Sequence, residues 1–171
     1  MRDGGALERM VQAEIGGKYL AVHAYDRMLW TIRSGFATLF FAGWGLLLRG
    51  IIEHPFGKVG DGLSNEAKEI LFVIVLTTVA LGFVGLLLDQ NYARRKFRVI
   101  YALDRLMGVM LAKAGQPPDP QELAEFVQVS GDKQNNTYRL VSGYRPAWWM
   151  AFWIYFTPVL LSGASTVILW T

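Results

Sequence analysis

The chain has 171 residues, of which 53% are hydrophobic, and a formal net charge of +3. This length allows one compact unit, and the apolar share is typical of a chain that carries a few membrane spans. The chain contains no cysteine, which excludes disulfide bonds and cysteine-ligated metal sites. The distribution of charge along the chain is more informative than its modest total.

The first predicted element is an amphipathic helix over residues 6–29, where apolar residues recur at three- and four-residue steps. Gly16 and Gly17 interrupt this pattern, and each weakens a helix by ~1 kcal/mol relative to alanine. We therefore expect a kink there or a frayed first half. Two placements stay open: the helix packs on the protein's own cytoplasmic part, or it lies in the membrane interface.

The first predicted membrane span covers residues 29–52. Its uncharged centre, Ser34–Leu48, has fifteen residues, so Arg33 and Arg49 are expected to extend toward opposite faces of the bilayer. Small residues along this span and the later ones predict faces on which another helix can approach closely. The glycines predicted to serve helix packing are Gly35, Gly43, Gly45, Gly82, Gly85 and Gly163.

The second predicted span is Ile70–Leu88, which follows a loop rich in turn formers over residues 53–68. Nineteen uncharged residues cross ~30 Å of hydrocarbon as a helix. Asp89 ends the run, and the helix is predicted to continue to Ala114. A cytoplasmic basic cluster follows Asp89 and consists of Arg94, Arg95, Lys96 and Arg98. We interpret it as a topology determinant that contacts anionic lipid headgroups.

The third predicted span occupies residues 146–171, which carry no charged side chain. Tryptophans at its start and end are typical of membrane interfaces. Pro158 lies in the middle of the span and predicts a kink, because proline lacks the N–H that would bond one turn back. The preceding segment, 116–145, is predicted to be a cytoplasmic loop with a short helix over residues 120–127 and a polar stretch over 130–137.

The sequence therefore predicts an all-α integral membrane protein with three transmembrane helices and cytoplasmic helical extensions. Its four parts are a cytoplasmic amphipathic helix (1–28), a two-span hairpin with its basic helix (29–115), the loop (116–145) and the third span (146–171). Lysine and arginine number five over residues 1–33, three over 49–69 and nine over 89–145. Because such cations are retained in the cytoplasm, the N-terminus is expected inside and the C-terminus on the far side. The inverted orientation is the alternative.

Arg33 and Asp89 are both expected at the cytoplasmic boundary, at the ends of adjacent antiparallel spans. They are therefore predicted to form an ion pair that sets the register of the first two spans, although the net stabilisation from such a pair can be near zero. The alternative is that each side chain reaches water separately.

The residue pattern contains no recognisable catalytic, metal-binding or cofactor-binding motif. His23 and His54 are expected on opposite sides of the membrane, so they cannot share a metal. Thr77 and Thr78, the polar residues of the second span, are expected to bond to the backbone rather than to an ion. We therefore expect no enzymatic activity, no cofactor and no nucleic-acid partner.

Two stretches of the chain resemble a family. Tyr19-Leu20, Arg27-Met28, Ile32-Arg33 and Thr38-Leu39 precede or begin the first span, and Leu88-Asp89, Tyr92, Arg95, Phe97-Arg98 and Tyr101 follow the second. Over residues 15–107 this arrangement is similar to the SLATT-type two-transmembrane effector domains of bacterial conflict systems. The chain departs from that pattern at Arg94, where the family has Glu, and in its third span. The resemblance implies pores that form when a sensor partner activates the protein.

Three hypotheses follow. The first is a non-enzymatic oligomeric protein of the bacterial inner membrane, acting as a pore-forming or membrane-perturbing effector of antiphage defence. Its partners would be the lipid bilayer, further copies of the chain and a cytoplasmic sensor. The second is an accessory or scaffold subunit of a larger membrane complex. The third is a membrane enzyme that acts on lipid, which the absence of a nucleophile–base or metal set in the sequence disfavours.

Overall fold

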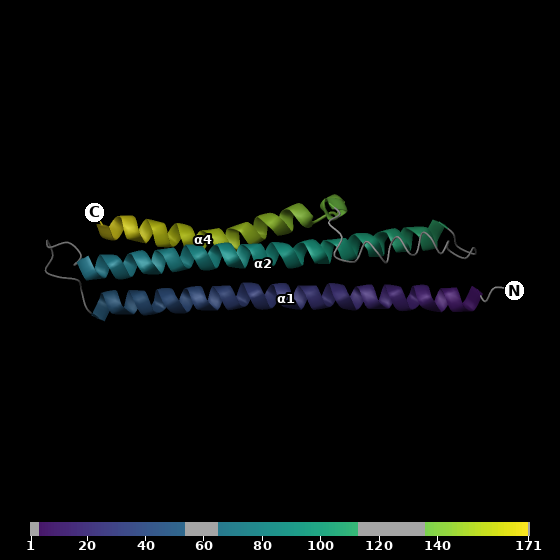
Figure 1. Ribbon diagram of the computed structural model, residues 1–171, viewed down its shortest axis with the longest axis horizontal. Helices are drawn as coiled ribbons and strands as arrows, with labels where there is room; N and C mark the ends of the chain where they lie inside the picture. Colours follow the sequence, from purple (N-terminus) through teal and green to yellow (C-terminus); the bar gives the residue numbers. More distant parts are fainter. Residues whose placement is uncertain (1–3, 54–64, 113–135, 171) are drawn as a thin grey trace. The chain divides into compact units, whose positions relative to one another are not determined.

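The computed structural model describes residues 4–53, 65–112 and 136–170. Over these residues it contains helices and one short turn, and no strand (Figure 1). The elements are α1 (Gly4–Glu53), α2 (Asn65–Ala112), the 3-10 helix η1 (Asn136–Leu140) and α4 (Tyr144–Trp170). The all-α prediction is confirmed for this part of the chain. The predicted short helix at 120–127, His54 and most of the predicted loop 53–68 lie outside the described residues.

α1 continues through Gly16 and Gly17 as one α-helix of 50 residues, so the expected fraying of its first half is wrong. Val11 and Lys18, which flank the two glycines, are 2% and 4% exposed. Tertiary packing supplies most of the stability of helices in proteins, and here it offsets the ~1 kcal/mol that each glycine costs.

The helices contribute to two compact units, which are described separately. Unit 1 consists of Met1–Leu29 and Asn91–Trp148, and unit 2 of Trp30–Gln90 and Trp149–Thr171. The divisions, after residues 29, 90 and 148, fall within two residues of the predicted span boundaries at 29, 88 and 146. Unit 2 therefore contains the segments predicted to lie in the membrane together with the loop between the first two spans, and unit 1 contains the segments predicted to be cytoplasmic.

An aromatic cluster forms the core of unit 1. Phe97, Tyr138 and Tyr144 are buried, and Ile100, Val141 and Ala147 pack against them. The ring of Tyr144 lies 5.4 Å from that of Phe97 and 4.9 Å from that of Tyr138, measured between centroids. Both pairs are edge-to-face, the arrangement that aromatic rings favour.

The connection into α4 is tighter than the sequence predicted. The predicted polar stretch ends in η1, which places Tyr138 in the aromatic cluster. The backbone then turns at Gly143, whose φ of 94° suits a residue without a Cβ. α4 begins at Tyr144, two residues before the predicted start, and Pro146 lies in its first turn, where a missing N–H removes no helical bond.

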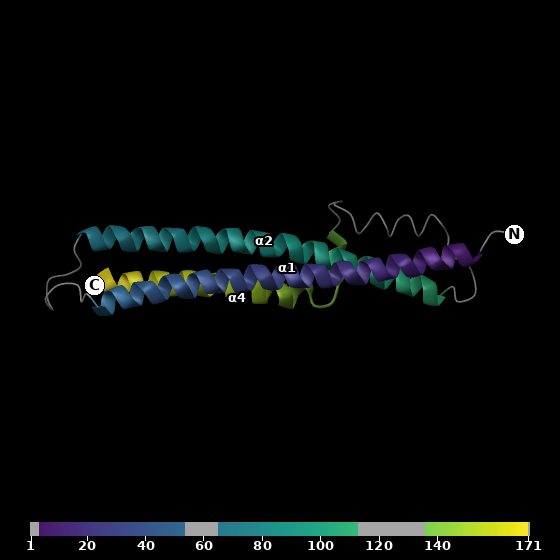
Figure 2. The same ribbon diagram turned by 90° about the horizontal axis from the view of Figure 1, so that it is seen from below.

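Unit 2 consists of three helical segments that lie side by side, from α1, α2 and α4 (Figures 1 and 2). Its outer surface carries large apolar side chains at high exposure. Examples that are more than 60% exposed are Trp30, Leu39, Phe41, Phe72 and Phe83. Large apolar side chains exposed in this number are typical of a surface that contacts membrane or protein rather than water.

Two of the described helical stretches, Lys68–Gly108 and Tyr144–Ala164, are long and apolar enough to cross a membrane. Core helices of soluble proteins pass the same test of length and composition, but they are mostly buried. Here the most apolar windows are only 17% and 22% buried. The predicted first span is not among the stretches that pass, and its side chains after Gly45 lie outside the described residues. The structure thus supplies two candidate spans where the sequence predicted three.

Candidate functional site

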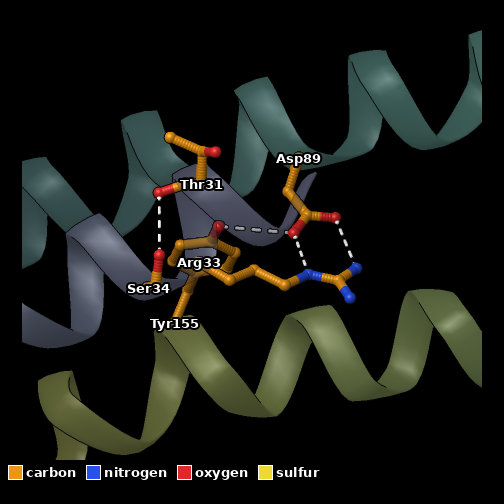
Figure 3. A network of polar contacts seen from close by, with 5 residues as sticks. All are labelled: Thr31, Arg33, Ser34, Asp89 and Tyr155. Atoms are coloured by element: carbon orange, nitrogen blue, oxygen red, sulfur yellow. Dashed lines mark hydrogen bonds and ion pairs between the residues drawn. The ribbon is translucent and has the colours of Figure 1, made fainter. Parts of the chain in front are cut away.

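The predicted pair of Arg33 and Asp89 is present in unit 2, between α1 and α2 (Figure 3). Arg33 Nε donates to Asp89 Oδ2 at 2.6 Å, and Arg33 Nη2 donates to Oδ1 at 3.1 Å. Two parallel charge-assisted bonds fix both the distance and the orientation of the groups. The pair therefore holds α1 and α2 in register across 56 residues of sequence.

Tyr155 brings α4 into the same network, which the sequence did not predict. Its hydroxyl donates to Asp89 Oδ2 at 3.3 Å, so the carboxylate accepts bonds from two other helices (Figure 3). The Asp89 side chain is 0% exposed and that of Arg33 is 16% exposed. A buried carboxylate is tolerated only when it is paired and hydrogen-bonded, and both conditions are met here.

Two glycines of α2 make the contact with α4 possible. An added Cβ at Gly85 would lie 2.5 Å from Cε1 and 2.8 Å from Cδ1 of Tyr155. An added Cβ at Gly82 would lie 3.2 Å from both the Tyr155 carbonyl oxygen and Val159 Cγ2. Phe36 of α1 packs edge-on against the Tyr155 ring, with centroids 4.8 Å apart. The Tyr155 ring therefore packs against Gly85, its carbonyl oxygen lies close to Gly82, and its hydroxyl donates to Asp89.

The other predicted packing glycines have open space around them in this chain. An added Cβ at any of them would meet no described atom within 4 Å outside its own helical turn. They are Gly35, Gly43, Gly45 and Gly163. Of the six glycines predicted to serve helix packing, Gly82 and Gly85 are thus the two that lie against another helix.

Pro158 lies inside α4 and is buried. Ser162 Oγ donates to the Pro158 carbonyl oxygen at 2.8 Å, so the hydroxyl finds a partner on its own helix. Thr77 and Thr78 do the same on α2, donating to the carbonyl oxygens of Val73 and Ile74 at 2.8 and 2.9 Å. The threonines therefore bond to the backbone, as expected.

The basic cluster divides into two halves in unit 1. Arg94 and Arg95 are exposed, whereas Lys96 and Arg98 are partly buried. Lys96 Nζ pairs with Asp26 Oδ1 of α1 at 2.5 Å, and the Arg98 guanidinium lies 5.4 Å from the centre of the Tyr138 ring. Two of the four basic residues therefore contact other side chains within unit 1, whereas the side chains of Arg94 and Arg95 are exposed.

The network of Arg33, Asp89 and Tyr155 can tie three helices together, because the carboxylate is enclosed and occupied as an acceptor. Among the described residues, no group of three or more histidine, aspartate and glutamate side chains is placed to hold a metal ion. Sequence reasoning found two members of the network and missed Tyr155, which is one of several aromatic residues in its segment. A comparison of the chain with protein-family models, curated proteins and solved structures finds no match.

Proposed function

We propose that the protein spans the bacterial inner membrane three times, through residues 29–52, 70–88 and 147–170. The observation that carries this proposal is the surface of unit 2, where large apolar side chains point outward while the charged pair is enclosed. Soluble proteins rarely leave apolar patches of such extent exposed. The first span also contains the apolar residues Leu46, Leu47 and Leu48 in its sequence. Unit 1 lies in the cytoplasm, because Lys and Arg are concentrated in its segments.

Its activity in this proposal is non-enzymatic: the protein assembles as an oligomer and forms a pore or perturbs the membrane as an effector of defence. The resemblance of residues 15–107 to SLATT-type effector domains supports this activity. Three helices cannot enclose an aqueous path by themselves, so conduction requires several copies. The open space around Gly35 and Gly43, which lie eight residues apart on α1, supplies a face that a second copy can approach closely.

The experiment that tests this proposal measures oligomeric mass in nanodiscs by native mass spectrometry, together with ion flux from loaded liposomes. A defined ring-sized assembly that releases ions is expected. Gly43→Leu adds a large side chain to the open face of α1. This variant should lower both the fraction of chains in the oligomer and the rate of ion release. Ala80→Leu adds similar bulk to an exposed position on α2 and serves as the matched control. A monomer without flux in both membrane systems contradicts the proposal.

A second candidate is an accessory subunit that docks a partner through unit 1. Large apolar side chains on unit 1 favour it: Met10, Leu20 and Leu140 are 69%, 73% and 78% exposed. In a segment proposed to be cytoplasmic, exposed apolar side chains of this size favour an interface with another protein. Stable co-purification of one partner that is lost in a Leu20→Ser, Leu140→Ser variant, with no flux from the purified chain, would favour this function over the pore.

A further inference from the structure

The charges of unit 1 are unevenly divided among its helices. The α1 part, residues 4–29, carries three acidic and three basic side chains. The described parts of its other segments, residues 91–112 and 136–148, carry seven arginine and lysine side chains and one acidic side chain, Asp104. Positive charge in unit 1 is therefore concentrated on α2, η1 and the start of α4.

Four of these arginines surround the aromatic cluster of unit 1 and are called the arginine patch. They are Arg94 and Arg98 on α2, Arg139 in η1 and Arg145 in the first turn of α4. Arg94 and Arg98 are four residues apart and so share one face of the helix. The Arg98 guanidinium lies against the Tyr138 ring, and Arg139 and Arg145 directly follow Tyr138 and Tyr144 in the chain. The contact between these two rings therefore brings the three elements of the patch together.

The described residues supply no acidic partner for the patch. None of its four arginines forms an ion pair or donates a side-chain hydrogen bond within the described part of the chain. Arg98 Nε is enclosed and donates to no acceptor there. α4 has no acidic residue in its first turn, so Arg145 adds positive charge at the helix end where the backbone dipole is already positive. An anion bound at the patch would relieve this unbalanced charge.

The patch lies at the proposed membrane boundary. Arg145 is two residues before the proposed third span, and Arg94 is six residues after the proposed second span. Helical side chains lean toward the N-terminus of their helix, which for α2 is the membrane side, so Arg94 and Arg98 are directed toward the bilayer. Leu140, next to Arg139 in η1, is 78% exposed. Basic side chains beside an exposed apolar one are typical of a surface that meets lipid headgroups.

We propose that the arginine patch binds the headgroup phosphate of an anionic phospholipid in the leaflet next to unit 1, with Leu140 in contact with the acyl region. The inference rests on the membrane insertion proposed above. The cation–π contact with Tyr138 uses the face of the Arg98 guanidinium, whereas its Nη donors lie in the plane of the group and can bind phosphate oxygens. An acidic protein segment matches the charge of the patch but neither its position at the bilayer nor Leu140, so the lipid is favoured.

The test uses the full chain in a mild non-ionic detergent, with lipids added and binding followed by native mass spectrometry. The lipids are phosphatidylglycerol and phosphatidylcholine with the same acyl chains, so they differ in net headgroup charge. Phosphatidylglycerol is expected to bind about tenfold more tightly, and this preference should decrease as salt is added. Equal binding of the two lipids overturns the proposal.

Variants locate the lipid at the patch. The double variant Arg139→Gln, Arg145→Gln removes two exposed charges and should lose most of the preference for phosphatidylglycerol. Arg9→Gln, Arg105→Gln makes the same change in net charge at exposed positions of unit 1 outside the patch and should keep the preference. Arg94→Gln, at an exposed position on α2, replaces the patch variant if that protein does not fold. An equal loss in the patch and control variants shows that net charge alone is read and overturns the site.

An acidic protein as the occupant is tested in the same assay with a polyglutamate peptide. Binding of the peptide that is lost in the patch variant, without a preference between the two lipids, assigns the patch to an acidic protein segment and overturns the lipid.

Carbonate extraction of the same proteins from cells separates this inference from the proposed function. A chain that stays in the membrane pellet but does not distinguish the two lipids contradicts the arginine patch alone. A chain released by carbonate contradicts the membrane insertion as well, and both proposals then fail together.

Discussion

Asp89 of α2 is the residue at which polar side chains from α1 and α4 meet in unit 2. Its carboxylate has no exposed surface and accepts bonds from Arg33 and Tyr155. A charge removed from water in this way is costly unless its partners stay in place. The sequence indicated Asp89 and Arg33 because each lies at the end of an uncharged run. It did not indicate Tyr155, because phenol side chains at that depth are also ordinary packing residues.

Asp89→Asn is expected to destabilise the protein by about 3 kcal/mol, because it leaves the buried guanidinium of Arg33 without its counter-ion. The double variant Arg33→Leu, Asp89→Leu should recover most of that loss, since it removes both charges together. The free energy of unfolding is measured by titration with SDS in a mild detergent. A double variant as unstable as Asp89→Asn would show that shape, rather than charge, dominates at this site.

The pair between Lys96 and Asp26 is the matched control. Its side chains are 20% and 45% exposed, so solvent screens their attraction. Asp26→Asn is expected to cost less than ~1 kcal/mol, and the cost should fall as salt is added. If Asp26→Asn lowered the free energy of unfolding as much as Asp89→Asn, burial would not be what makes the loss of an ion pair costly.

At the scale of elements, α4 is positioned on α2 by an alternation of small and large residues. Gly82 and Gly85 let α4 approach, and the Tyr155 ring occupies the space that a side chain at Gly85 would fill. On α4, Ala151 and Ser162 are also buried small residues, 0% and 2% exposed. Helices in membranes associate through such close packing, since lipid supplies no hydrophobic drive between them.

Gly85→Ala is expected to destabilise the protein by about 1–2 kcal/mol. Overpacking against a ring held by Asp89 and Phe36 costs ~1–3 kcal/mol, and alanine regains up to ~1 kcal/mol of helix propensity. Gly163→Ala, on α4 in the same unit, meets open space and should be neutral or stabilising by up to ~1 kcal/mol. Thermal unfolding of both variants checks the difference, and equal stabilities would contradict the packing of Tyr155 on Gly85.

At the scale of the whole molecule, the division into two units follows the boundaries that the sequence predicts for the membrane spans. Unit 1 combines ion pairs and an aromatic cluster, while unit 2 encloses its charged pair and exposes apolar side chains. Each unit is assembled from segments distant in the sequence, because the helices run through both. In the proposed orientation, α1, α2 and α4 therefore each cross the membrane boundary near the residue that separates unit 1 from unit 2.

Because the chain lacks cysteine, single-cysteine variants can map its orientation directly. Gln12→Cys and Asn136→Cys change exposed positions in unit 1 and should react with a membrane-impermeant maleimide only after the cells are opened. Asp61→Cys, in the loop expected on the far side, should react in intact cells. The reverse pattern would establish the inverted orientation, and reaction of all three in intact cells would contradict a cytoplasmic unit 1.

The sequence by itself determined the helical class and the positions of the three long helices to within a few residues, and it offered the pairing of Arg33 with Asp89 as one of two alternatives. These features depend on local apolar runs and on where charges interrupt them. The tertiary structure alone decided which glycines serve as contacts, that Tyr155 completes the network, and that η1 supplies Tyr138 to a core. Those outcomes depend on the register between helices far apart in the chain. Register is set by the shapes of facing side chains, which no single segment encodes.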